Sequence, residues 1–176
     1  MEAGGMWDAT EREANMLDGA AHFYDTYECA DGKYISLGSI EPQFYALLKD
    51  IAGLSEEDFG NQHDRSQWPL MKEKLAAVML QKTQAEWCEL MEGTDVCFAP
   101  VLNFVEAASH PANVARETYV EVGGVTQPAP APRFSRTPSR VAHATHDAGE
   151  DTNEVLIAMG LAQGEIDQLR EAGSIS

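Results

Sequence analysis

The feature that most constrains the fold is the succession of elements within residues 22–53: two strands joined by a turn, then a sharp corner and a helix. Asp31-Gly32 separates two Tyr-rich runs. An Asp-Gly pair favours the tight turn of an antiparallel hairpin because it tolerates positive φ angles. We therefore expect two paired strands, at residues 22–29 and 33–39.

A helix is predicted directly after the second strand, from Pro42 to Gly53. Proline fits the first helical turn, where its missing N–H costs no hydrogen bond, and glycine commonly ends a helix. Its apolar positions follow the spacing i, i+3, i+4, i+7 that marks one face of a helix: Phe44, Leu47, Leu48 and Ile51.

Glu41 occupies the corner before this helix, where Ser, Thr, Asp or Asn is the usual capping residue. In one interpretation its negative charge interacts with the helix dipole, which stabilises the helix by about 0.3–1 kcal/mol. In the other, the corner holds a carboxylate that points across a cleft and orients a catalytic base. The residues alone favour the first interpretation.

The rest of the chain alternates helices with extended segments, which predicts an α+β fold. Ser66 is a candidate cap for the first of the further helices, and Thr83 with Glu86 forms a capping-box pattern at the second. The final two helices have modest apolar faces, so we expect them to pack on another part of the protein. The predicted segments are helices at 66–82 and 83–93, an extended run at 95–102, a proline-rich crossover at 126–139, and helices at 151–159 and 164–172.

The composition excludes several classes of protein. A net charge of −17 repels phosphates, which disfavours binding to nucleic acid or to an anionic membrane surface. The sequence has no apolar run of membrane-spanning length and no basic-then-apolar signal at its start. Its three cysteines lack the spacing of a zinc site, which indicates buried thiols in a reducing compartment. We therefore expect a cytoplasmic protein.

No complete catalytic motif can be read from the residues. His143, His146 and Asp147 have a loose metal-like spacing, but their polar surroundings favour a solvated segment. His22 is expected to be a partly buried histidine on a strand rather than a catalytic one. We predict no metal site and no cofactor. A cross-strand aromatic cluster is a candidate wall of an apolar pocket, and its members are Tyr24, Tyr27 and Tyr34.

Several blocks closely resemble α-methylacyl-CoA racemases of the CaiB/BaiF, or family III CoA-transferase, superfamily. They occur in the family's order and span nearly the whole chain. Family chains are much longer, so the sequence resembles their C-terminal half. The blocks are "ANMLDGAAHFYDTYECADGKYISLGSIEPQFYALL" (14–48), "TDVCFAPVLNFVEAASHP" (94–111), "VARETYVEV" (114–122), "APAPRFSRTPS" (129–139) and "EDTNEVLIAMGLAQGEIDQLREAGSI" (150–175).

The resemblance implies an intertwined homodimer in which each chain has a large Rossmann-like α/β domain and a smaller α+β domain. Residues 1–18 would be the linker from a large domain absent from this sequence, and 19–125 the small domain with its antiparallel hairpin and helices. Residues 126–176 would form the proline-rich crossover and the C-terminal helices that return to complete the large domain.

The resemblance also implies a reaction, which is inversion at the carbon next to an acyl-CoA thioester. A base on one face and an acid on the other act through an enolate. The family's catalytic His and Asp belong to the half that is missing here. Glu41 matches the glutamate that hydrogen-bonds this His from the partner chain, and Met16, Tyr24 and Ile40 match positions around the acyl pocket. His22 stands where the family usually has Pro.

Two alternatives remain open at this point. The chain could be part of a family III CoA-transferase, which uses an Asp nucleophile in the missing half. It could also be a non-catalytic dimerisation or binding module. The block "GSIEPQF" favours the racemase, because transferases tend to have a Gly-rich loop where this sequence has only Gly38 before the helix.

Overall fold

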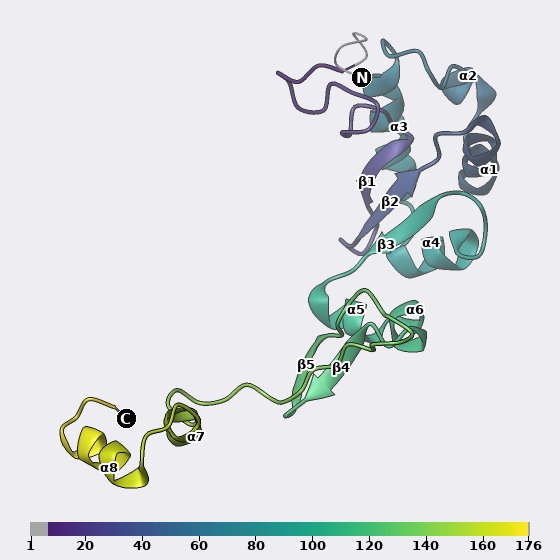
Figure 1. Cartoon of the computed structure of the whole chain (residues 1–176). Helices are drawn as coiled ribbons and strands as arrows, with labels where there is room; N and C mark the ends of the chain where they lie inside the picture. Colours follow the sequence, from purple (N-terminus) through teal and green to yellow (C-terminus); the bar gives the residue numbers. More distant parts are fainter. Residues whose placement is uncertain (1–6, 176) are drawn as a thin grey trace. The chain divides into compact units, whose positions relative to one another are not determined.

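The computed structural model describes residues 7–175 and divides into two units, residues 1–103 and 104–176. Each unit has its own sheet and helices (Figure 1). The mixture of small antiparallel sheets with helices agrees with the predicted α+β class.

The first unit has a three-stranded antiparallel sheet in the order β1-β2-β3. Tyr24 pairs with Gly38, and Ser36 pairs with both Thr26 and Ala99. The strands are β1 (Tyr24–Glu28), β2 (Tyr34–Gly38) and β3 (Phe98–Val101). The helices are α1 (Pro42–Ala52), α2 (Glu56–Phe59), α3 (Trp68–Met79) and α4 (Gln84–Met91).

The predicted hairpin is confirmed, with Gly32 in the left-handed region at φ 74°. The first strand begins later than expected. His22 lies in a turn before β1, because the amide of Tyr24 donates to the carbonyl of Ala21 (2.9 Å) and bends the chain there. The prediction that His22 lies on the strand is therefore wrong.

The core of the first unit lies between the helices and one face of the sheet. Tyr27, Ile35 and Leu37 point into it and are at most 3% exposed. Burying a side chain of this size contributes about 1.5–3 kcal/mol. The helices supply the other large buried side chains: Tyr45, Leu48, Phe59, Trp68, Met71, Leu75, Met79, Trp87 and Met91.

Helix α1 begins at Pro42 and ends before Gly53, as predicted. Its buried residues are Leu48 and Tyr45, whereas Phe44 stays half-exposed. The spacing rule missed Tyr45. Its ring can be buried because its hydroxyl group is hydrogen-bonded inside the protein, to His22 and to the carbonyl of Phe59. Gly53 has φ 67° and closes the helix in the left-handed region, which favours glycine.

The two following helices differ in how they begin. The Thr83 capping box is confirmed, since its side chain accepts from the Glu86 amide and Glu86 bonds back to Thr83. Ser66 does not cap α3, and that prediction is wrong. The Ser66 hydroxyl and amide instead donate to Asp64 (2.6 and 3.0 Å), and α3 starts after Gln67 without a side-chain cap.

The second unit is built from short elements. Strands β4 and β5 form an antiparallel hairpin through Gly123-Gly124, and the last two helices form close to the predicted positions. Its elements are α5 (Phe104–Ser109), α6 (Pro111–Ala115), β4 (Tyr119–Val122), β5 (Val125–Pro128), α7 (Thr152–Ala158) and α8 (Gln163–Glu171). Within residues 7–175, no helix combines the length and apolar character needed to cross a bilayer.

Candidate functional site

The candidate site is centred on Glu41, at the corner between β2 and α1. Its backbone is extended (φ −71°, ψ 144°), its side chain is exposed, and it makes no capping hydrogen bond to the helix. A capping hydrogen bond therefore does not explain why a carboxylate stands here, and an interaction with the helix dipole stays the competing interpretation. The side chain is accessible for an interaction outside its own helix.

The backbone before Glu41 is held by Ser39, which is fully buried. The Ser39 amide donates to the carbonyl of Phe23 (3.0 Å), and its hydroxyl donates to the carbonyl of Val96 (2.5 Å). These bonds tie the corner to the start of β1 and to the approach of β3. An exposed carboxylate thus stands on an immobilised segment.

A second buried polar residue reaches the same corner from the loop between α2 and α3. The Gln62 carboxamide donates to the carbonyls of Ser39 (3.0 Å) and Ile40 (2.9 Å). Sequence reasoning missed both Ser39 and Gln62. Neither belongs to a chemical motif, and a lone Ser or Gln gives no signal that it is buried.

Cys97 lies close enough to Glu41 for the carboxylate charge to act on its thiol, although the two are far apart in sequence. Its backbone is left-handed (φ 57°), and its carbonyl accepts a hydrogen bond from the amide of Gly38 (2.8 Å). Partial burial raises the pKa of the Cys97 thiol, and the negative charge of Glu41 raises it further. Cys97 is exposed, so the prediction of buried thiols is wrong for this residue.

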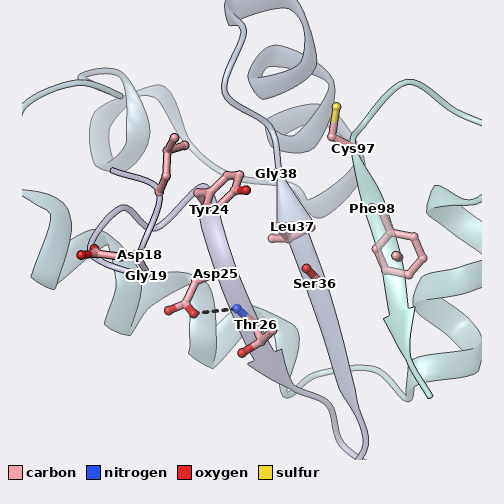
Figure 2. A pocket seen from close by; sticks show the side chains of 12 residues that line it. Asp18, Gly19, Tyr24, Asp25, Thr26, Ser36, Leu37, Gly38, Cys97 and Phe98 are labelled. Carbon is pink, nitrogen blue, oxygen red and sulfur yellow. Dashed lines mark hydrogen bonds between the residues drawn. The ribbon is translucent and has the colours of Figure 1, made fainter. Parts of the chain in front are cut away.

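A pocket of about 430 Å³ opens on the sheet face opposite the core, next to this corner (Figure 2). Tyr24 and Cys97 flank Gly38 at one end of it; a Cβ built on Gly38 would lie 3.7 Å from the Tyr24 ring and from the Cys97 carbonyl. The missing side chain at Gly38 keeps this end open. The lining residues are Leu17, Asp18, Gly19, Tyr24, Asp25, Thr26, Ser36, Leu37, Gly38, Cys97, Phe98 and Ala99.

The predicted site residues occupy different places around this pocket. Tyr24 lines it. Ile40 lies in the corner immediately before Glu41, and Met16 lies in the segment before β1. Both are half-buried and pack against the edge of the core, and neither is among the pocket-lining residues. Their roles in binding stay predictions.

The segment that carries Met16 is organised by Asn15, which is 1% exposed. Its side chain donates to the carbonyl of Asp8 (2.9 Å) and to the carboxylate of Asp18 (2.6 Å). Lys72 of α3 then donates to the carbonyl of Gly19 (2.7 Å). These contacts fix the edge of the pocket against α3.

His22 is fully buried, away from the site surface. Tyr45 donates its hydroxyl hydrogen to the carbonyl of Phe59 (2.9 Å), so the Nε2 of His22, 2.8 Å from the hydroxyl oxygen, must be the donor. The Nδ1 atom has no partner, and burial lowers the pKa of His22 to about 4. A neutral, enclosed imidazole of this kind is part of the core.

The described residues hold no group of three or more His, Cys, Asp or Glu side chains placed to bind a metal ion. His146 does pair with Asp151 (2.5 Å), and this bond raises the pKa of the imidazole. His143 stacks near it at 4.6 Å between ring centroids. The pair lies at the surface of the second unit.

Comparison with solved structures supports the fold. A CaiB/BaiF family protein from Brucella suis superposes with a TM-score of 0.70 at 17% identity, covering 89% of this chain and 42% of that one. The protein Rv3272 from Mycobacterium tuberculosis gives a TM-score of 0.60 at 20% identity over 77% of this chain and 39% of that one. The fold of this chain is thus shared with part of each of two larger proteins.

Sequence relatives identify the family. The chain is 47% identical over 168 residues to α-methylacyl-CoA racemase of Mus musculus and 44% identical to that of Homo sapiens. These matches cover 94% and 93% of this chain but 44% and 43% of the relatives, so the chain spans less than half of their length. The sequence model of CoA-transferase family III matches residues 1–152. The chain belongs to CoA-transferase family III.

Proposed function

We propose that this chain is the C-terminal part of a 2-methylacyl-CoA racemase. The reaction is epimerisation at the thioester α-carbon, in which one group removes the α-proton and another delivers a proton to the opposite face of the resulting enolate. The observation that carries the proposal is the 47% identity to the mouse racemase over 168 residues. A relationship this close across 94% of the chain favours a shared reaction over a shared fold alone.

The chemistry divides between this chain and a segment outside it. A His and an Asp in the N-terminal half serve as base and acid on opposite faces of the α-carbon. The thioester acidifies the α-proton, so the proposed reaction uses no metal or redox cofactor. Residues 126–176 return to complete a large Rossmann-like domain, and two chains intertwine as a homodimer.

Glu41 orients the catalytic histidine of the partner chain. A carboxylate that accepts from one imidazole nitrogen fixes the tautomer and ring orientation, and it stabilises the protonated imidazole. This role needs an accessible carboxylate on a fixed backbone. The exposed side chain and the buried bonds of Ser39 and Gln62 support it.

Tyr24, Ile40 and Met16 form part of the wall that contacts the acyl group. Each is partly exposed while its inner side packs on the core, so an apolar surface is presented without a loss of support. The pocket beside Tyr24 has a floor of small residues, including Ser36 and Gly38, which leaves room for an acyl branch.

The proposal is tested with a fused enzyme, in which the mouse racemase segment preceding its match is joined to this chain. We expect the 176-residue chain alone to be inactive and the fused enzyme to exchange the α-proton of 2-methylacyl-CoA for solvent deuterium. Exchange by the isolated chain would contradict the divided site. CoA transfer between carboxylic acids without α-proton exchange would favour the transferase instead, and neither activity in a folded fusion would favour a binding module.

A further inference from the structure

We propose that Gln62 is a positioning residue for Glu41 in the racemase reaction. The inference rests on the proposed function, because it concerns how the Glu41 carboxylate is oriented toward the catalytic histidine. Gln62 lies outside the corner in sequence, in the loop between α2 and α3, and its side chain is 8% exposed. Its amide nitrogen is buried against the backbone carbonyls of the corner, so it acts through Glu41 rather than on the substrate.

The geometry of the carboxamide suits this task. The amide nitrogen of Gln62 has two hydrogens, and the carbonyls of Ser39 and Ile40 accept at 3.0 and 2.9 Å. These are consecutive peptide groups, and the second one is bonded to the nitrogen of Glu41. Fixing its plane, together with the bond from the Tyr45 amide to the Glu41 carbonyl (3.0 Å), restricts the direction in which the Glu41 side chain leaves the backbone.

Gln62 is itself anchored by the interior. The indole of Trp68, a buried residue at the start of α3, donates to the backbone carbonyl of Gln62 (2.8 Å). The corner is therefore supported from α3 through Gln62, in addition to its support from β1 and β3 through Ser39. Loss of Gln62 removes one support and leaves the others in place.

A purely structural role is the competing explanation, and a double-mutant cycle separates the two. Gln62→Met keeps the length of the side chain and removes both donors. Gln81→Met makes the same chemical change on an exposed residue and is the matched control. Each is made in the fused enzyme, with Glu41 and with Glu41→Gln.

We expect Gln62→Met to lower kcat by about tenfold or more, with KM within about twofold, because small errors in aim are costly in catalysis. The Gln81→Met enzyme should match the unsubstituted one. In the Glu41→Gln background, Gln62→Met should cause no further fall in kcat. A fall by the same factor in both backgrounds, or an unchanged kcat, would overturn the inference.

Hydrogen–deuterium exchange in the 176-residue chain provides a readout that needs no activity. Peptides covering residues 38–45 should exchange faster in Gln62→Met than in Gln81→Met, while the β1–β2 hairpin keeps its protection. Unchanged exchange at the corner would contradict the proposed support. If the unsubstituted fusion folds but shows no α-proton exchange, the proposed function fails, and this catalytic inference fails with it.

Discussion

The two units of the chain use their apolar residues in opposite ways. In the described part of the chain, every buried hydrophobic side chain except Ile166 lies in the first unit. The second unit exposes large apolar side chains instead, with Phe104 at 93%, Val105 at 81% and Met159 at 72%. The first unit therefore encloses a core of its own, whereas the second offers apolar surface without one.

This contrast indicates that the first unit is stabilised by its own core, whereas the second unit depends on packing against another part of the protein. Helices shorter than about 12 residues are marginal in isolation and gain most of their stability from packing an apolar face on another element, as the helices of the first unit do. Helices α7 and α8 have 7 and 9 residues. Their exposed faces support the proposal that residues 126–176 complete another domain.

Separating the units should produce the largest effect. We expect residues 1–103 to show a cooperative thermal transition by circular dichroism, because the core is complete there. Residues 104–176 alone should show none. A cooperative transition in residues 104–176 would contradict the difference between the units, since it would mean that this segment forms a core by itself.

Single substitutions of apolar residues should show the same difference between the two units, with smaller effects. Leu75→Ala, at a fully buried position of α3, should lower the free energy of unfolding by about 2–5 kcal/mol. Val155→Ala, at a position of α7 that is 52% exposed, should change it by less than about 0.5 kcal/mol. Urea denaturation of both variants provides the measurement. Equal losses would show that the second unit contributes to the same core.

Burial of His22 should make the first unit sensitive to acid. The folded pKa of about 4 lies below the ordinary value of 6.5, so the unfolded chain binds the proton more readily. The stability from keeping this imidazole neutral is complete above pH 6.5 and is lost as the pH falls toward 4. Between pH 7 and pH 5 the loss is about 2 kcal/mol at most.

Replacing the titrating group tests this sign. In His22→Phe, the difference in free energy of unfolding between pH 7 and pH 5 should shrink by about that amount. His143→Phe, at an exposed position of the second unit, is the matched control and should leave the difference unchanged. An unaltered pH dependence in His22→Phe would mean that the imidazole is not held neutral.

The smallest expected effect compares a buried cysteine with an exposed one inside the first unit. Burial raises the pKa of Cys29 to about 11, so its thiol should resist alkylation until the protein unfolds. Cys97 should be alkylated in the folded protein. Glu41→Gln should speed this reaction about twofold by lowering the thiol pKa, as followed by peptide mass spectrometry. An unchanged alkylation rate would show that the charge of Glu41 does not act on the Cys97 thiol.

Much of the first unit could be predicted from local sequence rules. The Asp31-Gly32 turn, the helix between Pro42 and Gly53 and the Thr83 capping box each depend on a few adjacent residues. The misplaced features depend on contacts distant in sequence. Local patterns predict a strand at His22 and omit Tyr45 from the core face of its helix, because the hydrogen bond between these two residues spans 23 positions of sequence.

The site shows the same limit. The unusual carboxylate at Glu41 was visible in the sequence, because it occupies a position that normally carries a cap. Its support was not visible. Ser39 reaches Val96 across 57 residues, and Gln62 reaches Ser39 across 23, and no local pattern reports such pairings.

The central claim is that Glu41 is one half of an active site completed by a histidine outside this chain. Its most direct test is Glu41→Gln in the fused enzyme, assayed by α-proton exchange and by acyl-CoA binding. We expect turnover to fall by about 100-fold with binding nearly unchanged, because a misoriented histidine loses part of the roughly 10²–10⁴-fold that a general base contributes. Equal exchange rates for Glu41 and Glu41→Gln would remove the carboxylate from the mechanism and contradict the account.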